Sequence, residues 1–141
     1  MTHAQRSKRL MDQWGFNCSC SACSAPAQEI SASDTRIARI EALQSQLTDL
    51  SPTRNASIAT AEELVSLYEE ESLSAPIAEA YYYAALECSY SGDLGCVKKW
   101  ARKAAEVGRL WRGPDHADTR RWEALLADPE AHETWLYKLE E

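Results

Sequence analysis

The sequence predicts a mainly α-helical protein in which a short cysteine-rich loop precedes a set of antiparallel helical hairpins. Three observations lead to this fold class. Apolar residues recur every three or four positions over most of the chain, which is the period of an amphipathic helix. The 141 residues include only five glycines and five prolines, which fall mainly where a helix should begin or end. Three cysteines lie within six consecutive residues near the N-terminus.

The length of 141 residues suits a small module followed by a helical domain, and we place these parts at residues 1–26 and 27–141. The first part contains an N-terminal helix and the cysteine loop. Apolar residues make up 45% of the chain, which is enough for a hydrophobic core. No apolar run approaches the length of a membrane span, so we expect no membrane partner.

Charge is distributed unevenly along the chain. The formal net charge is −7, with +2 on residues 1–17 and −9 on the remainder. An acidic body disfavours direct nucleic-acid binding, which depends on neutralising phosphates. The first residues also lack the apolar segment of a signal peptide, so we expect a protein of the nucleus, the cytoplasm or both.

The first helix after the cysteine loop is expected over residues 34–50. Ser33 or Asp34 can act as its N-cap, and Ser51 followed by Pro52 can end it. Apolar residues at three- and four-residue spacing form one stripe along this helix. The stripe consists of Ile37, Ile40, Leu43, Leu47 and Leu50.

The second helix is predicted to open at Thr60, with Glu63 three residues later completing a capping box. Its inward side chains are expected to be Leu64, Leu67, Tyr68 and Leu73. A third helix is predicted to begin at Ser74, with Pro76 near its first turn. Gly92 is a typical C-terminal stop for it.

A fourth helix is expected over residues 94–111 and ends at Gly113 and Pro114. Two further helical stretches are predicted at residues 117–126 and 130–139. Tight turns between short helices favour stacked helical hairpins.

The helices within residues 76–111 indicate how the hairpins pack. Alanines on the first helix permit close approach, and a tryptophan and two alanines on the second offer a facing surface. These positions are Ala80, Ala84 and Ala85 on one helix and Trp100, Ala101 and Ala104 on the other. The arrangement resembles a degenerate tetratricopeptide unit. We interpret the run from Tyr81 to Tyr83 as core and groove packing rather than a cofactor site.

The segment Trp-Gly-Phe-Asn-Cys-Ser-Cys-Ser-Ala-Cys at residues 14–23 contains the pattern C-x-C-x-x-C. Three thiolates on one short loop can converge on a single soft cation, and zinc knuckles use the C-x-x-C spacing. Cys18, Cys20 and Cys23 are therefore predicted to bind zinc, with unliganded surface thiols as the alternative. Tetrahedral zinc needs one ligand more than this pattern supplies.

Other residues offer weaker alternatives for the remaining ligand. His3, Cys88 and Cys96 carry suitable donor atoms, but each lies on a different segment from the cluster. A complete disulfide framework is disfavoured because the five cysteines are odd in number. Neighbours as close as Cys18 and Cys20 also do not pair easily.

The cysteine segment resembles the post-SET segment of SET-domain protein-lysine methyltransferases, especially the SET-and-MYND branch. Arg6 and Leu10 precede the Gly-Phe-Asn-Cys-Ser-Cys-Ser-Ala-Cys run at positions similar to the family pattern. Proteins of that branch follow the zinc loop with a helical, tetratricopeptide-like domain. The stretch at residues 104–117, with Trp-Arg-Gly-Pro-Asp-His near its end, also resembles the hairpin tail of that domain.

The resemblance implies that this chain is the C-terminal part of a longer methyltransferase. The catalytic core of the family precedes the zinc loop and supplies the fourth zinc thiolate. The chain alone is therefore expected to be inactive and to hold no catalytic residue. In an intact parent, S-adenosylmethionine is the cofactor, and Phe16 matches the aromatic residue that lies against its adenine ring. The alternative for Phe16 is a hydrophobic plug between the zinc loop and the helices, and Trp14 has the same two interpretations with a weaker case.

A stand-alone helical interaction module, stapled by zinc, is the competing functional class. In either class the helical groove is expected to bind a protein or peptide, and the methyltransferase interpretation includes histones among the partners. His116 is expected to cap or pack at the start of a helix. His132 is expected on an exposed face of the final helix.

Overall fold

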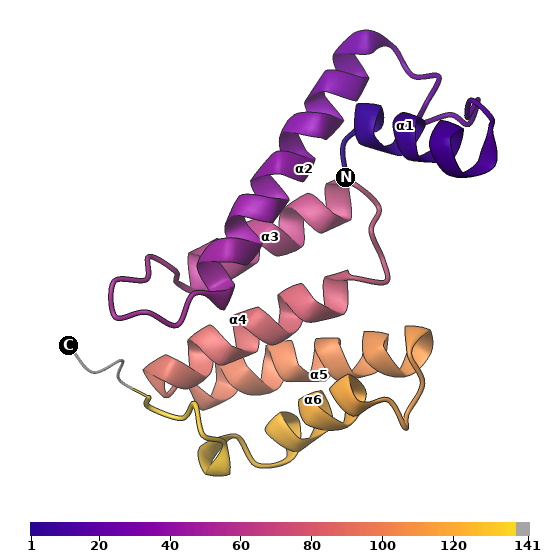
Figure 1. The fold of residues 1–141 in the computed structure, drawn as a ribbon. Coiled ribbons are helices and arrows are strands. Elements are labelled where there is room, and N and C mark those ends of the chain that lie inside the picture. The colour runs from indigo at the N-terminus through magenta and orange to yellow at the C-terminus, as the bar shows by residue number, and fades with distance from the viewer. Residues whose placement is uncertain (138–141) are drawn as a thin grey trace. The chain divides into compact units, whose positions relative to one another are not determined.

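The computed structural model describes residues 1–137, in which six α-helices and one short 3-10 helix are joined by loops and turns (Figure 1). The predicted fold class is confirmed: the described part of the chain is mainly helical, and a cysteine cluster lies near its N-terminus. The chain divides into two compact units, Met1–Ala42 and Leu43–Glu141. This division falls inside helix α2 (Ala27–Thr48). The helix itself begins at the first residue after the predicted boundary at residue 26.

Helix α1 (His3–Trp14) opens the first unit with a reciprocal cap. The hydroxyl of Thr2 accepts from the backbone N–H of Gln5, and the amide oxygen of Gln5 accepts from the N–H of Thr2. The N–H of His3 donates to the carboxylate of Asp34 at 2.7 Å, so the start of α1 is tied to α2 within this unit.

Helix α2 begins seven residues before the predicted start, so the N-cap assigned to Ser33 or Asp34 was wrong. The carbonyl of Pro26 accepts from the N–H groups of Glu29 and Ile30, and thereby opens the helix. Four of the seven intervening residues are strong helix formers (Ala27, Gln28, Glu29 and Ala32) and none is glycine or proline, so the helix extends N-terminally beyond the apolar stripe. Asp34 consequently lies inside the helix, where its carboxylate is free to accept from α1.

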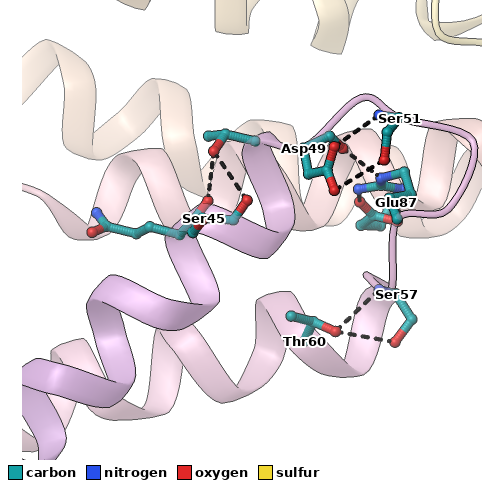
Figure 2. Close-up of polar contacts among 9 residues, drawn as sticks. Ser45, Asp49, Ser51, Ser57, Thr60 and Glu87 are labelled. Atoms are coloured by element: carbon teal, nitrogen blue, oxygen red, sulfur yellow. Dashed lines mark hydrogen bonds and ion pairs between the residues drawn. The ribbon is translucent and has the colours of Figure 1, made fainter.

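Helix α2 also ends earlier than predicted. The hydroxyl of Thr48 donates to the carbonyl of Gln44 at 2.8 Å, and Asp49 accepts from the N–H of Ser51 in the turn that follows (Figure 2). Such local side-chain bonds compete with continued helix. Leu50 therefore lies outside the helix and is 68% exposed. The other four residues of the predicted stripe are buried: Ile37, Ile40, Leu43 and Leu47.

Helix α3 (Ile58–Glu70) starts two residues before the predicted position. The cap is formed by Ser57, whose N–H donates to the hydroxyl of Thr60, so the predicted cap at Thr60 and Glu63 was wrong (Figure 2). Leu64 and Tyr68 are buried as predicted. The other two residues predicted to point inward, Leu67 and Leu73, are only partly buried.

Helices α4 (Ile77–Ser91), α5 (Leu94–Trp111) and α6 (Ala117–Ala127) form the antiparallel stack of the second unit (Figure 1). Their bounds agree closely with the prediction, except that α4 begins three residues after the predicted start at Ser74, with Pro76 as its N-cap. Every small residue expected between α4 and α5 is buried, and Trp100 stacks on Tyr81 with ring centroids 5.7 Å apart. The alanines at this interface are Ala80, Ala84, Ala85, Ala101, Ala104 and Ala105.

Helix α6 approaches α5 closely at Gly108. A Cβ atom at Gly108 would lie 2.6 Å from Cζ3 of the buried Trp122, so a larger residue would force the two helices apart. Arg112, at the end of α5, forms ion pairs with Glu79 of α4 and Asp118 of α6. These two ion pairs link α4 and α6 to the C-terminal end of α5.

The predicted helix at residues 130–139 was wrong for the part that the structure describes. Only Pro129–Ala131 form a 3-10 helix, and residues 132–137 form turns, while residues 138 and 139 lie outside the described part. The N–H of Leu136 donates instead to the carbonyl of Ser89 in α4, with Leu136 at a φ of +53°. A tertiary contact therefore replaces the local helical bonds.

A buried ion pair fastens the α2–α3 loop to α4. Arg54 of the loop pairs with Glu87 of α4, and their side chains are only 8% and 7% exposed (Figure 2). The Arg54 guanidinium also lies over the ring of Tyr90, 5.3 Å from its centroid. None of the helices in residues 1–137 combines the length and the hydropathy that a membrane span requires.

Gly92 supplies the first testable feature of this fold. Its φ is +72°, and an added Cβ would overlap the side chain of Leu136. We expect Gly92→Ala to lower the free energy of unfolding by about 1–3 kcal/mol, because alanine is strained in the left-handed region. Urea unfolding followed by circular dichroism measures this loss.

Gly95 is the matched control, because it lies in the first turn of α5 with only the Asp93 carboxylate near its would-be Cβ, at 3.7 Å. Gly95→Ala should leave stability unchanged or raise it by up to about 1 kcal/mol. Equal unfolding midpoints for the two variants would contradict the assigned role of Gly92.

Candidate metal centre

The cysteine loop begins where α1 ends. Gly15 takes a φ of +67°, and its N–H donates to the carbonyl of Met11 at 3.0 Å, which closes the last turn of the helix. The chain then turns back on itself, because the N–H of Ser24 donates to the carbonyl of Cys20 at 2.9 Å. Both features are short-range, so the loop follows from its local sequence.

The loop brings the three predicted zinc ligands together. The Sγ atoms of Cys18, Cys20 and Cys23 all lie within 4.8 Å of one another. Sulfur atoms bound to one tetrahedral zinc at a Zn–S distance of about 2.3 Å are separated by about 3.8 Å. The three thiols therefore need only a small inward movement to share one ion. Thiolate sulfur is a soft donor that suits zinc.

Hydrogen bonding within the cluster moves the pKa values of Cys20 and Cys23 in opposite directions. A backbone hydrogen bond from Cys23, and then a side-chain hydrogen bond from Cys18, lower the pKa of Cys20 to about 7. The pKa of Cys23 is raised, mainly because its thiol is hydrogen-bonded to Cys18 and Cys20. Cys20 is thus substantially ionised near neutral pH, and the thiolate is the form that binds a metal ion.

No fourth protein ligand joins this cluster among residues 1–137. His3 is outside the group of converging donor atoms. Cys88 and Cys96 form a disulfide with each other across the α4–α5 turn, with their Cα atoms 5.6 Å apart. The odd cysteine count had disfavoured a complete set of disulfides, but it left room for this single pair, which removes both residues as thiol ligands.

Phe16 and Trp14 flank the start of the loop with their rings accessible. Phe16 is 47% exposed and Trp14 is 72% exposed. Both interpretations of Phe16, cofactor contact and a hydrophobic plug, stay predictions. An accessible ring two residues before Cys18 suits contact with a planar ligand, and this role stays a prediction.

The two remaining histidines differ in outcome. His116 is the N-cap of α6, and its Nδ1 atom accepts from the N–H of Asp118 at 3.2 Å, as the sequence had indicated. The helical placement of His132 was wrong. It lies in the turns after the 3-10 helix, is only partly exposed, and has its Nδ1 atom 2.8 Å from the Thr134 hydroxyl.

The second unit contains a cavity that sequence reasoning missed. It measures about 370 Å³ and is lined by residues of α4, the α2–α3 loop and the segment after α6. These residues are Leu50, Tyr82, Leu86, Tyr90, His132, Glu133, Thr134 and Tyr137. The four-residue spacing of Tyr82, Leu86 and Tyr90 was a visible signal that one helical face is partly aromatic.

Comparison with protein-family models, with characterised protein sequences and with solved structures found no match for this chain.

The cysteines provide a direct chemical test of the site. Brief treatment of the folded, metal-free chain with iodoacetamide should alkylate Cys18, Cys20 and Cys23, because these thiols are free and none is buried. Cys88 and Cys96 should be modified only after reduction and unfolding. Peptide mass spectrometry identifies the modified positions. Protection of the three loop cysteines without metal would contradict their exposure in this structure.

Proposed function

We propose that this chain is the C-terminal part of a SET-domain protein-lysine methyltransferase of the SET-and-MYND type. The observation that supports the proposal is the convergence of three thiols directly after α1 and ahead of a stack of helical hairpins. This is the order of zinc loop and helical domain that the sequence resemblance implies. The cysteines are held by local turns, so the same loop can form within a longer protein.

Zinc is the metal that this proposal assigns to Cys18, Cys20 and Cys23. Three soft thiolate donors within 4.8 Å suit a tetrahedral site with one further ligand. In the intact parent, a cysteine of the catalytic core completes the site. The ion then fixes the loop against that core, as a structural zinc does.

Phe16 is the residue that we assign to cofactor contact. The zinc loop would hold its accessible ring against the adenine of S-adenosylmethionine in the intact parent. The cofactor supplies the reactive methyl group, and the protein supplies orientation and desolvation. The groups that aim the methyl group at a lysine amine belong to the catalytic core. We therefore infer that residues 1–141 alone do not transfer a methyl group.

A stand-alone interaction module stapled by zinc is the second candidate function. The observation that favours it is an open groove of about 450 Å³ along α3, α4 and α5. Leu110 and Trp111 on its rim are 78% and 57% exposed, as expected of a surface that binds a protein or peptide. The genomic sequence upstream of Met1 separates the two functions, because only the first requires a reading frame for a SET core.

A location in the nucleus or the cytoplasm accompanies the methyltransferase proposal. Both compartments are reducing, so the three loop thiols would remain available to zinc. Histones are among the partners that this location permits.

Zinc content tests the proposed metal. The chain alone should hold less than one equivalent of zinc, because three thiolates leave one position open to solvent. The chain expressed together with its catalytic core should hold one tightly bound zinc per molecule. Elemental analysis by mass spectrometry measures both, with Cys20→Ser as the control that should lose the metal. Absence of zinc from the joined protein would contradict the proposal.

A methyl-transfer assay tests whether activity requires the catalytic core in addition to this chain. The purified 141-residue chain should show no transfer of labelled methyl groups to histones, and its affinity for S-adenosylmethionine should be too weak to measure by calorimetry. The physical reason is that one exposed ring cannot bury most of a ligand. The joined protein serves as the active control. Turnover by the chain alone would place the catalytic centre within these residues and overturn the proposal.

A further inference from the structure

Three tyrosine rings line one cavity in the second unit. Tyr82 and Tyr90 come from the same face of α4, with Leu86 between them. Tyr137 comes from the segment after α6, and its ring centroid is 6.4 Å from that of Tyr90 at an interplanar angle of 50°. Tilted rings of this kind present both faces and edges to a shared space of about 370 Å³.

The wall that carries Tyr137 is fastened to α4 through one residue. Ser89 is fully buried, and its hydroxyl accepts from the hydroxyl of Thr134 at 2.8 Å. The carbonyl of Ser89 accepts from the N–H of Leu136 at 2.9 Å. These two bonds bracket the segment between Glu133 and Tyr137, so both side chains are held beside the tyrosines of α4.

The cavity has an electrostatic preference for a cation. Glu133 is the one carboxylate among its lining residues. Burial above all raises the pKa values of Tyr82 and Tyr90. The charge of Glu133 adds to the rise in both, whereas Arg121 opposes it at Tyr82 and Arg54 opposes it at Tyr90. Both phenols therefore stay neutral through the physiological range, and their ring faces carry the negative end of the quadrupole.

Tyr90 already takes part in a cation–π contact. The Arg54 guanidinium lies 5.3 Å from its ring centroid, outside the set of residues that line the cavity. The charge of Arg54 is balanced by Glu87 in the buried ion pair. Among the residues that line the cavity, Glu133 is the one acidic residue and none is arginine or lysine, while Arg121 acts on Tyr82 from outside the lining.

We propose that this cavity binds the methylated ammonium group of a di- or trimethylated lysine in a basic polypeptide. A methylated ammonium group is a bulky, weakly hydrated cation that contacts several aromatic faces at once. An unmodified lysine ammonium is strongly hydrated and loses more on entering an apolar space. A polypeptide is the favoured source because residues 18–141 carry a net charge of −9, which complements a basic chain. This inference does not depend on the methyltransferase proposal.

The test uses the full chain and three peptides of one sequence, Gly-Gly-Lys-Gly-Gly. One carries trimethyllysine, one carries unmodified lysine, and one carries a neutral isostere in which carbon replaces the charged nitrogen. Titrations followed by NMR of the tyrosine ring protons give the dissociation constants. We expect the trimethylated peptide to bind about tenfold more tightly than either comparison peptide.

Two substitutions in exposed lining residues probe the ring and the charge. Tyr137→Leu keeps apolar volume but removes the aromatic face, and Glu133→Gln removes the charge while keeping the shape. Each should weaken binding of the trimethylated peptide by about threefold to tenfold. The matched control for the charge lies outside the cavity: Glu106→Gln removes an exposed carboxylate from α5. This control should bind as the unmodified chain does.

Three outcomes would overturn the inference. Equal affinity for the neutral isostere would show an apolar cavity without preference for a cation. Unchanged affinity in both Tyr137→Leu and Glu133→Gln, with circular dichroism confirming the fold, would place binding elsewhere. Choline binding as tightly as the trimethylated peptide would overturn the assignment to a polypeptide and point to a small molecule.

Discussion

The close approach of α4, α5 and α6 is the constraint on which the second unit depends. The interface between α4 and α5 is built mainly from alanines, whose burial individually contributes little. Their small side chains allow the backbones of α4 and α5 to approach closely, so that larger residues such as Tyr81 and Trp100 can stack beside them. Gly108 extends the same principle to α6, because Trp122 occupies the space that a side chain would need. The stack therefore requires small side chains at these positions as much as it requires the large side chains around them.

The sequence was most informative where structure is set by neighbouring residues. The end of α4 and both bounds of α5 were predicted to the residue, because Gly92 and the Gly113-Pro114 pair are local stop signals. The predictions for the start of α2 and for the region after Pro129 were wrong, because other interactions determine the backbone conformation there. Helix-forming residues after Pro26 extended α2, and the bond from Leu136 to Ser89 replaced a final helix with turns. The bond from Leu136 to Ser89 could not be predicted from local sequence, because it joins residues that are far apart in the chain.

The same distinction separates the two candidate sites. The three thiols converge within one loop of six residues, so their spacing alone indicated a metal site. The tyrosine cavity is assembled from α4, the α2–α3 loop and the segment after α6, and its geometry depends on the buried Ser89. Helical spacing placed two tyrosines on one face. Nothing in the sequence pattern indicated that Glu133 and Tyr137 would be folded against them.

The buried ion pair between Arg54 and Glu87 makes a cation site at Tyr90 electrostatically possible. An unpaired guanidinium stacked on that ring would repel a second cation across a short distance of low dielectric. Glu87 lies on α4 between Leu86 and the hydrogen-bonding turn that contains Ser89, so the helix that carries the tyrosines also carries the compensating charge. The pair thus has two consequences from one geometry. It fastens the α2–α3 loop to the stack, and it balances the guanidinium charge that lies over the ring of Tyr90.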